Sequence, residues 1–404
     1  MGLLSVSFWV GAFFYVSAVT SNMILGIPAK SITLLFLVLA LWLDGWKKKT
    51  RISIVSVKVI CLTLAVFGVW GLIGVLNGYV LSMFQQCMKV FTVFFMFYIF
   101  DYIYENKTIA IEEMKGIVIK AFGLSVIFKI GLECLYMLKV IDAEQLLELI
   151  EKGTGMQVMS LLIADGILCR LGTISDVFAL SIFPFVYVIE KRKCRRILII
   201  LATIALMIIN YSRIYMVQTL VLLFVLLVPM SRVISKRWIK WWLVTMILFI
   251  GVGVMFSNIW LTALDGRFIG ADAEASDYQR YVQIAYLLEG IKDDFWWGHG
   301  FGSFVPGFTR SDDYPFLYEV EILALIYQVG AIGLAMLIWA FVLIIKRAPF
   351  KGLSFRYRLL VYINAVFFLL RSLFNPMLFA SNSIIVLISM IFLVSIIKKE
   401  CIND

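Results

Sequence analysis

Long apolar stretches recur from one end of the chain to the other, with short polar segments between them. Most have about the length of ~20 residues that a helix needs to cross the hydrocarbon core of a bilayer. The pattern therefore predicts an all-α polytopic membrane protein, with twelve transmembrane helices in one domain covering residues 1–404. The predicted spans are residues 3–20, 24–43, 52–76, 79–100, 117–138, 173–190, 197–211, 213–230, 241–257, 320–345, 359–375 and 378–397.

The apolar run from 197 to 231 is too long for a single crossing, and we divide it at the sequence NYSR, residues 210–213. Arg213 is the only charged residue between Arg196 and Arg232. An unpaired charge inside hydrocarbon costs at least ~2.5 kcal/mol, and an intramembrane charge is a functional hypothesis by default. The division moves Arg213 to the membrane surface, at the depth of a lipid phosphate.

Most of the 36 Lys and Arg residues lie in short clusters on one predicted side of the membrane. The positive-inside rule makes that side cytoplasmic, together with both termini. The opposite side has two long segments, 139–172 and 258–319, of which the second is a large outer loop between the ninth and tenth spans. The first part of 139–172 alternates apolar and acidic residues at helical spacing, which predicts a helix along the membrane surface. The basic clusters are 46–51, 101–116, 191–196, 231–240, 346–358 and the tail from Lys398.

Composition supports a membrane protein and excludes several other classes. The chain is 62% hydrophobic and 15% charged, with a mean hydropathy of +0.98, whereas soluble domains are about a quarter charged. The net charge of +10 follows membrane topology, so we expect no nucleic-acid partner. Six scattered cysteines without a CxxC pair, and one histidine, predict neither a disulfide framework nor a metal site, and we expect no cofactor. The N-terminus has no signal-peptide cleavage pattern and is interpreted as a retained span.

The predicted outer side is rich in arginine close to the membrane boundary. A guanidinium group is always charged and grips phosphate or carboxylate with two parallel hydrogen bonds. Several arginines at one surface indicate a polyanionic ligand at headgroup level, such as a pyrophosphate, whereas a single arginine is explained as well by interfacial snorkelling or pairing. The candidates for pyrophosphate binding are Arg170, Arg213, Arg267, Arg280, Arg310 and Arg371, with His299, Tyr211, Trp297 and Tyr318 as neighbouring substrate contacts.

The outer loop 258–319 contains a predicted helix that carries Arg280. Ser276 and Gln279 stand in capping-box positions, apolar residues then recur at helical spacing, and Gly290 is a plausible terminator. Arg280 thus lies on or beside an apolar stripe. The glycine-rich sequence GHGFGSF, 298–304, either lets backbone amides approach an anion or forms a tight turn under the aromatic cluster before it.

Two carboxylates, Glu319 and Glu321, stand where the chain re-enters the membrane. They either complement the dipole at the start of a helix or supply a general base that deprotonates a sugar hydroxyl.

The order of these features resembles the bacterial polysaccharide polymerase and O-antigen ligase superfamily. The resemblance rests on the Ser-Arg at a span end (NYSRIYMV), the arginine-bearing helix (YQRYVQIAYLLEGIKDDFWWGHGFGSF) and the acidic residues before LIYQVGAIGLAMLIWAF. It is best over residues 170–345. The family implies a GT-C-like membrane fold and metal-independent glycosyl transfer from undecaprenyl pyrophosphate at the outer face of the bacterial inner membrane.

Carried onto this chain, the resemblance assigns Arg213 and Arg280 to the pyrophosphate, and Glu319 or Glu321 to the acceptor hydroxyl. Ligases typically have a His-Asn pair where this chain has LYEVE, 317–321, which favours a polymerase of O-antigen, capsule or exopolysaccharide repeat units. The alternatives are an O-antigen ligase acting on lipid A core, as in lipopolysaccharide assembly, and a lipid-linked oligosaccharide flippase. The expected partners are the undecaprenyl-pyrophosphate-linked oligosaccharide, membrane lipids, a chain-length regulator and a flippase.

Overall fold

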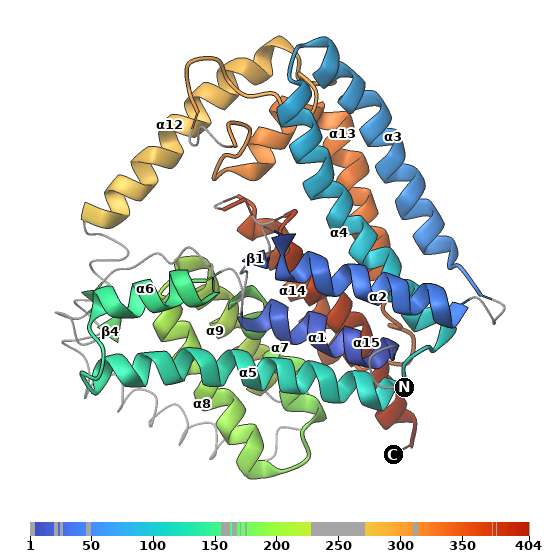
Figure 1. The fold of residues 1–404 in the computed structure, drawn as a ribbon, viewed down its shortest axis with the longest axis vertical. Helices are drawn as coiled ribbons and strands as arrows, with labels where there is room; N and C mark the ends of the chain where they lie inside the picture. Colours follow the sequence, from blue (N-terminus) through green and yellow to red (C-terminus); the bar gives the residue numbers. More distant parts are fainter. Residues whose placement is uncertain are drawn as a thin grey trace.

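The computed structural model describes residues 5–19, 23–24, 27–45, 50–154, 162–163, 168–169, 171–173, 176–227, 271–309, 314–373, 375–376 and 378–403. Two antiparallel pairs of two-residue strands accompany the helices: β1 (Met23–Ile24) with β2 (Ile27–Pro28), and β3 (Leu162–Ile163) with β4 (Leu168–Cys169). The helices are α1 (Val6–Val19), α2 (Ala29–Gly45), α3 (Ile54–Leu76), α4 (Val80–Asn106), α5 (Ile111–Met137), α6 (Ala143–Thr154), α7 (Asp176–Ile189), α8 (Lys193–Asn210), α9 (Arg213–Leu227), α12 (Ala271–Asp293), α13 (Glu321–Lys346), α14 (Phe355–Arg371) and α15 (Ser381–Asn403) (Figure 1).

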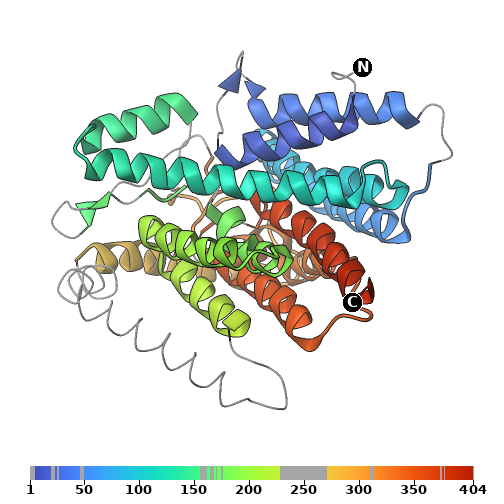
Figure 2. The same cartoon turned by 90° about the horizontal axis from the view of Figure 1, so that it is seen from below.

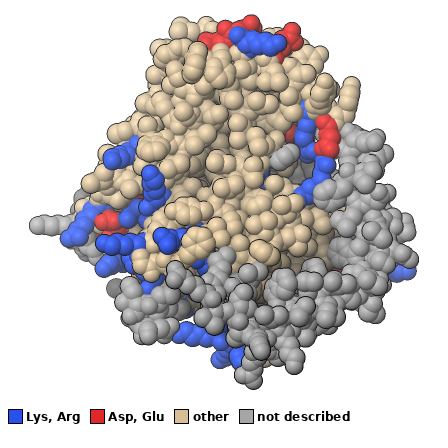
Figure 3. Space-filling model, turned by 180° about the vertical axis from the view of Figure 1, so that it is seen from behind, with Lys and Arg blue, Asp and Glu red and all other residues tan. Residues whose placement is uncertain are grey.

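The apolar runs are helical over most of the residues that the structure describes, although 24–43 begins in the strand pair of β1 and β2; the predicted span 241–257 lies outside the described residues. Four helical segments are long and apolar enough to cross a membrane: α3, α4, α13 and Asn382–Lys399 of α15. The helices α1, α7 and α9 are apolar but shorter. The chain is thus a helical membrane protein. Figure 3 shows the corresponding surface on one face, where a broad uncharged area separates charged groups near its margins.

The division of the run 197–231 is confirmed. Helix α8 ends at Asn210, and α9 begins at Arg213. Between them Tyr211 has a φ of 50°, in the left-handed conformation that commonly ends helices. The backbone N–H of Met216 donates to the Ser212 carbonyl at 2.9 Å, which begins the hydrogen-bond ladder of α9. The arginine therefore occupies the first position of a helix.

Helix α15 lies at the centre of the molecule. Of its most apolar 18-residue window, 89% is buried, and its apolar residues are spread around its whole circumference, as expected of a helix enclosed on all sides. It packs against α4, α5 and α7 (Figure 2). The other long apolar helices expose large hydrophobic side chains, for example Leu64 on α3 and Phe84 on α4, which suits contact with lipid.

Polar contacts join helix ends in two separate groups. At one end, Arg347 after α13 pairs with Asp101 and Glu105 at the end of α4, with an Nε–Oδ1 distance of 2.5 Å to Asp101. At the other end, the start of α13 bonds to Ser372 at the end of α14, and Lys30 in α2 donates to Asn382 in α15 at 2.6 Å. The start of α13 thus lies at the end of α14, so these two consecutive helices run in opposite directions.

A buried ionic pair joins α5 to α7. Lys129 Nζ lies 2.6 Å from the Asp176 carboxylate, and both side chains are almost fully buried. Asp176 also accepts hydrogen bonds from the Thr173 backbone N–H and from the Asn210 side chain at the end of α8. Removing one partner of a buried pair leaves an uncompensated charge, which costs about 3–5 kcal/mol. The network thus locks three helices near the turn that precedes Arg213.

The amphipathic helix in the segment 139–172 is α6. Leu146 and Ile150 on its apolar stripe are fully buried against Leu132, Cys169 and Ile209. The stripe that predicts a membrane-surface helix is therefore covered by protein, and the opposite, acidic side faces outward.

The arginine-bearing helix of the outer loop is α12, and two features predicted for it are wrong. It begins at Ala271, so Ser276 is inside the helix rather than capping it, and it continues past Gly290 to Asp293. A Cβ on Gly290 would lie 2.6 Å from the ring of Tyr327. The glycine therefore allows α12 to approach α13 closely, and it does not terminate the helix.

Helix α13 is broken at Gly330, where φ is 64° and ψ is 179°. The segment 295–300 repairs the break: the N–H groups of His299 and Gly300 donate to the carbonyls of Tyr327 and Gln328 at 2.9 and 2.7 Å. On the far side, the Ala331 N–H donates to the Phe295 carbonyl at 2.9 Å. Irregular backbone in a membrane protein requires such internal partners.

The glycine-rich segment 298–304 is a packing element. Its amides from 298 to 303 all donate to protein acceptors, so they are not arranged for an anion. A Cβ on Gly300 would lie 2.2 Å from the backbone nitrogen of Gly74 on α3. Of the two alternatives that the sequence leaves open, the structure shows the tight turn.

We predict that Gly300→Ala destabilises the protein strongly, because the added Cβ collides with backbone that cannot move aside. Gly307→Ala is the matched control: Gly307 also has a positive φ of 79°, but nothing lies within 4 Å of its added Cβ. The control should lose only the conformational cost of about 1–2 kcal/mol. Thermal unfolding in detergent measures both, and equal shifts in Tm would contradict the packing role of Gly300.

Candidate functional site

The candidate site lies at the helix ends that include the starts of α9 and α13. Helix α12 runs from the tops of α3, α4 and α13 toward the side of the molecule that holds α9 (Figure 1). Its inward face carries Arg280, Gln283, Leu287 and Ile291, whereas Tyr281 is exposed. The predicted apolar stripe is therefore confirmed for Leu287 and Ile291 but not for Tyr281. Arg280 lies on the inner side of the helix.

Arg213 and Arg280 converge on a single carboxylate, Asp277. The Arg213 guanidinium binds it with two parallel hydrogen bonds, Nη1 to Oδ2 at 2.9 Å and Nη2 to Oδ1 at 2.6 Å. Arg280 Nη1 donates to the same Oδ1 at 2.9 Å. Two guanidinium groups from different helices thus meet at one oxygen atom. Such bidentate, charge-assisted contacts are also the way in which arginine binds phosphate.

The opposite side of Arg280 faces Glu319. Arg280 Nε lies 2.9 Å from Glu319 Oε2, and the backbone N–H of Glu319 donates to Gln283 Oε1 at 2.7 Å. Positive and negative groups therefore alternate from α9 through α12 to the residues just before α13. The exposed fraction falls along this row, from 53% for the Asp277 side chain through 17% for Arg280 to 9% for Glu319.

The pKa of the Asp277 carboxyl is shifted, and its contacts with the two arginines explain the shift. The hydrogen bonds from Arg213 hold the pKa of the Asp277 carboxyl below its usual range, and the charge of Arg280 acts in the same direction. Partial burial opposes them but does not prevail. The carboxylate is thus ionised at physiological pH and neutralises part of the charge of the two arginines.

Arg371 is a third cation at this end of the molecule, and it is buried. Its side chain ends α14 with 1% exposure, and its Nε donates to the Phe367 carbonyl at 3.0 Å. The guanidinium carbon lies 5.7 Å from the centre of the Tyr215 ring on α9, two residues after Arg213. The Tyr215 side chain is also a hydrogen-bond partner of the guanidinium. A buried charge is costly unless it has such partners.

Glu321 is the first residue of α13 and is buried. Its Oε2 accepts a hydrogen bond from the Leu378 N–H at 2.6 Å. It borders a small polar cavity together with Lys89 and Gln86 of α4 and Gln328 of α13. The cavity has a volume of about 10 Å³, which is roughly the room that one water molecule needs.

The aromatic and histidine candidates are used within the fold. The His299 ring lies 3.1 Å from the Gly290 carbonyl, and Tyr318 accepts the Val305 N–H and donates to the Phe308 carbonyl. Trp297 stacks on Trp70 with ring centres 5.9 Å apart.

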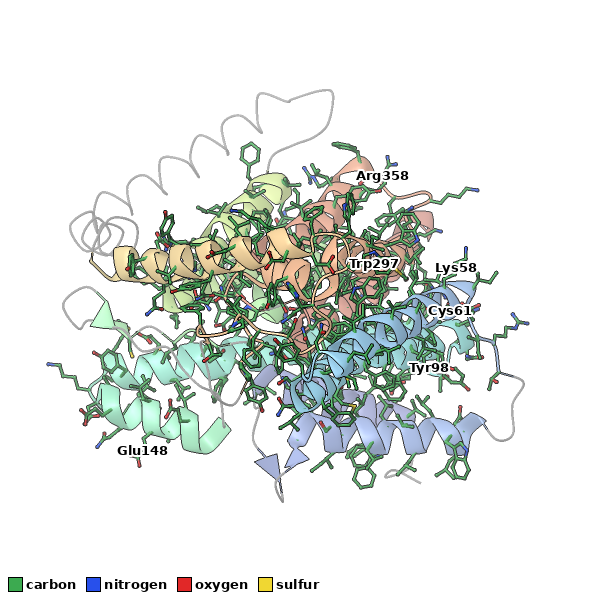
Figure 4. All side chains as sticks on the ribbon, turned by 90° about the horizontal axis from the view of Figure 1, so that it is seen from above. Lys58, Cys61, Tyr98, Glu148, Trp297 and Arg358 are labelled. Atoms are coloured by element: carbon green, nitrogen blue, oxygen red, sulfur yellow. The ribbon has the colours of Figure 1, made fainter. Side chains whose placement is uncertain are left out.

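Figure 4 shows Trp297 near the C-terminal end of α12, while Glu148 points outward from α6. Tyr211 forms the turn before Arg213. These contacts position α12 and α9 and are not part of the charged row. Arg170, Arg267 and Arg310 lie outside the described residues.

Two charged residues of this region, Asp277 and Lys89, are not among the site residues predicted from the sequence. Asp277 lies three residues before Arg280, on the adjacent turn of one helix, a spacing that allows an ion pair. Lys89 lies alone in the apolar sequence of α4, the same signal that singled out Arg213. In the described ranges, no group of three His, Cys, Asp or Glu residues could hold a metal ion.

No protein-family model matches the chain, and no curated protein matches its sequence.

We predict that acid releases the N-terminal half of α12. The folded-state pKa of Asp277 is lowered, so its contribution is complete above its unfolded value of about 4 and is lost as pH falls below that value through the folded pKa. Hydrogen exchange of the backbone amides of 271–283, corrected for the intrinsic pH dependence, should accelerate as pH falls below about 4. Asp277→Asn should exchange at one fast rate throughout, and a retained acid transition in this variant would contradict the prediction.

Proposed function

We propose that the chain is a membrane glycosyltransferase that polymerises undecaprenyl-pyrophosphate-linked repeat units into O-antigen, capsule or exopolysaccharide. In this proposal twelve spans cross the bacterial inner membrane with both termini in the cytoplasm, in a GT-C-like arrangement. The opposite directions of α13 and α14 and the basic sequences at the end near Arg347 support this topology. The row of Arg213, Asp277, Arg280 and Glu319 then faces the outer side.

One observation carries the proposal: two arginines from separate helices meet at one anion-binding position at the level where the helices begin. The position is occupied by a carboxylate, and its donors have the geometry that a phosphate oxygen requires. A diphosphate leaving group develops negative charge as its bond to the sugar breaks. Donors that are already in place stabilise that charge without reorganisation at the moment of reaction.

The reaction is a substitution at the anomeric carbon of the growing chain. A hydroxyl oxygen of the incoming lipid-linked unit forms the new glycosidic bond, the bond from the anomeric carbon to the pyrophosphate oxygen breaks, and undecaprenyl pyrophosphate leaves with the electron pair. The hydroxyl proton passes to a carboxylate. Arg213 and Arg280 hold the leaving group, and the buried guanidinium of Arg371 adds positive potential from the protein interior.

Of the two carboxylates, we assign the base to Glu321. Glu321 borders the small cavity beside α4, whereas Glu319 is held by its ion pair with Arg280, with an Nε–Oε2 distance of 2.9 Å. Glu319 is also fixed by its backbone bond to Gln283, which makes it a positioning residue for Arg280.

The broken helix α13 is the feature that a transporter would share, since transport sites are often built from discontinuous helices. In this chain, however, the segment 295–300 fills the break at Gly330, and the backbone groups on both sides bind that segment. The break therefore serves packing, and the charged row lies elsewhere. Reconstitution with a labelled lipid-linked repeat unit separates polymerisation from transfer to lipid A core and from translocation without covalent change.

We predict that Arg213→Ala and Arg280→Ala each reduce surface glycan to single-repeat product on a gel. Loss of one charge-stabilising donor typically lowers turnover by about 10²–10³. The control is Lys292→Ala, which removes an exposed positive charge from the same helix α12. Long-chain product from both arginine variants, at normal protein levels in the membrane, would refute the assigned roles.

We also predict that Glu321→Gln lowers the elongation rate more than Glu319→Gln does. Loss of a general base costs about 10²–10⁴ in rate, whereas loss of a positioning carboxylate leaves the base in place. Single-turnover elongation of a labelled lipid-linked unit measures both. The reverse order would transfer the role of base to Glu319.

A further inference from the structure

Asp277 occupies the position at which an anionic ligand would bind. Its two oxygens accept two N–H groups of Arg213, one from Nη1 and one from Nη2, and one N–H group of Arg280. An incoming phosphate must therefore replace this carboxylate before it can use the same donors. The anion site of this structure thus holds a competitor supplied by the chain itself.

The exposed fractions of Asp277 and Glu319 show which contact an incoming anion can replace. The Asp277 side chain is 53% exposed, and its contacts with the arginines are therefore open to solvent and weak. Glu319 is 9% exposed and also held through its backbone, so its contact with Arg280 stays. An arriving anion thus replaces Asp277 and leaves Arg280 anchored to Glu319.

Helix formation does not explain the aspartate. Asp277 lies inside α12, six residues after its start at Ala271, where the side chain cannot cap the helix and where aspartate is a poor helix former. Its side chain is oriented toward Arg213 on another helix. The structure therefore uses this residue for its charge.

The lipids around the site determine which anions Asp277 would exclude from the arginines. At headgroup level the arginines face a large excess of phospholipids, whose phosphodiesters carry one negative charge. Exchange of one carboxylate for one such phosphodiester leaves the number of charges at the arginines unchanged. A diphosphate diester carries two charges and more acceptor oxygens, so its exchange for the carboxylate gains contacts.

We propose that Asp277 is a specificity-determining residue that keeps singly charged lipid headgroups out of the arginine site and admits a diphosphate. This inference rests on the proposed function, because the diphosphate is the leaving group of that reaction. Asp277 acts by competition, so its removal strengthens the binding of every anion and lowers the preference for diphosphate.

The test uses the full chain in nanodiscs of phosphatidylcholine, with inorganic pyrophosphate as the probe in titration calorimetry. Asp277→Asn should bind pyrophosphate about three- to tenfold more tightly than the unaltered chain, the range expected from the loss of two weak ion pairs. In nanodiscs with one third phosphatidylglycerol, the variant should lose most of this gain, while the affinity of the unaltered chain should change little.

Glu289→Gln is the matched control, since it removes one negative charge from an exposed position of the same helix. It should bind pyrophosphate like the unaltered chain in both lipids. Weaker binding by Asp277→Asn would show that the residue only holds α12 in place and would overturn the proposal. An unchanged affinity, a gain that phosphatidylglycerol does not remove, or the absence of pyrophosphate binding in all three proteins would also overturn it.

The outcome is separable from that of the proposed function. Competition by Asp277, combined with normal long-chain glycan from Arg213→Ala, would leave a selective diphosphate site that is not the polymerase centre. Single-repeat product from Arg213→Ala without any competition by Asp277 would leave the polymerase and remove only the present inference.

Discussion

The structure depends on the requirement that charges among membrane helices find partners within the protein. Lys129 and Asp176 form such a pair, with Asn210 and a backbone N–H around the carboxylate. At the opposite end of the helices, Asp101 forms an ion pair with Arg347. Each pair joins helices that are distant in sequence, so the cost of burying charge becomes a constraint on which helices are neighbours. The same rule applied to backbone groups explains why the break in α13 is filled by another segment of the chain.

Against this rule, the charged groups near the start of α9 are notable because two of them share a carboxylate that is half in solvent. Arg371 is as buried as Lys129, and its described contacts are the Phe367 carbonyl and the Tyr215 side chain rather than a carboxylate. Arg213 and Arg280 both bind the half-exposed Asp277. Positive charge is thus available at one position that solvent reaches. That difference distinguishes a site from a structural ion pair, and it is the reason for placing the chemistry at these helix ends.

The sequence determined the helices more securely than the site. Apolar runs placed the apolar helices and the turn before Arg213, because a membrane helix must be apolar along most of its length. The sequence assigned the wrong role to Gly290 because a glycine in a helix signals either an end or a close contact, and only the neighbouring Tyr327 decides between them. It left 298–304 undecided because the acceptors of the amides of 299–302 lie on α3, α4 and α13. Asp277 was missed because its partner Arg213 is 64 residues away.

The two halves of α12 are held by different forces, and this difference links the fold to the site. Leu287 and Ile291 in the C-terminal half are buried in a cluster with Tyr318 and Tyr327. The segment 295–300, which fills the break in α13, comes shortly after this half in the chain. The described contacts that hold the N-terminal half are polar: Asp277 pairs with Arg213, Arg280 pairs with Glu319, and Gln283 accepts the Glu319 N–H. Regions held by few buried apolar contacts open most readily. The half of α12 that depends on polar contacts is therefore the half that carries the competing carboxylate, and exchange of Asp277 for a ligand leaves the Arg280–Glu319 contact and the packed half in place.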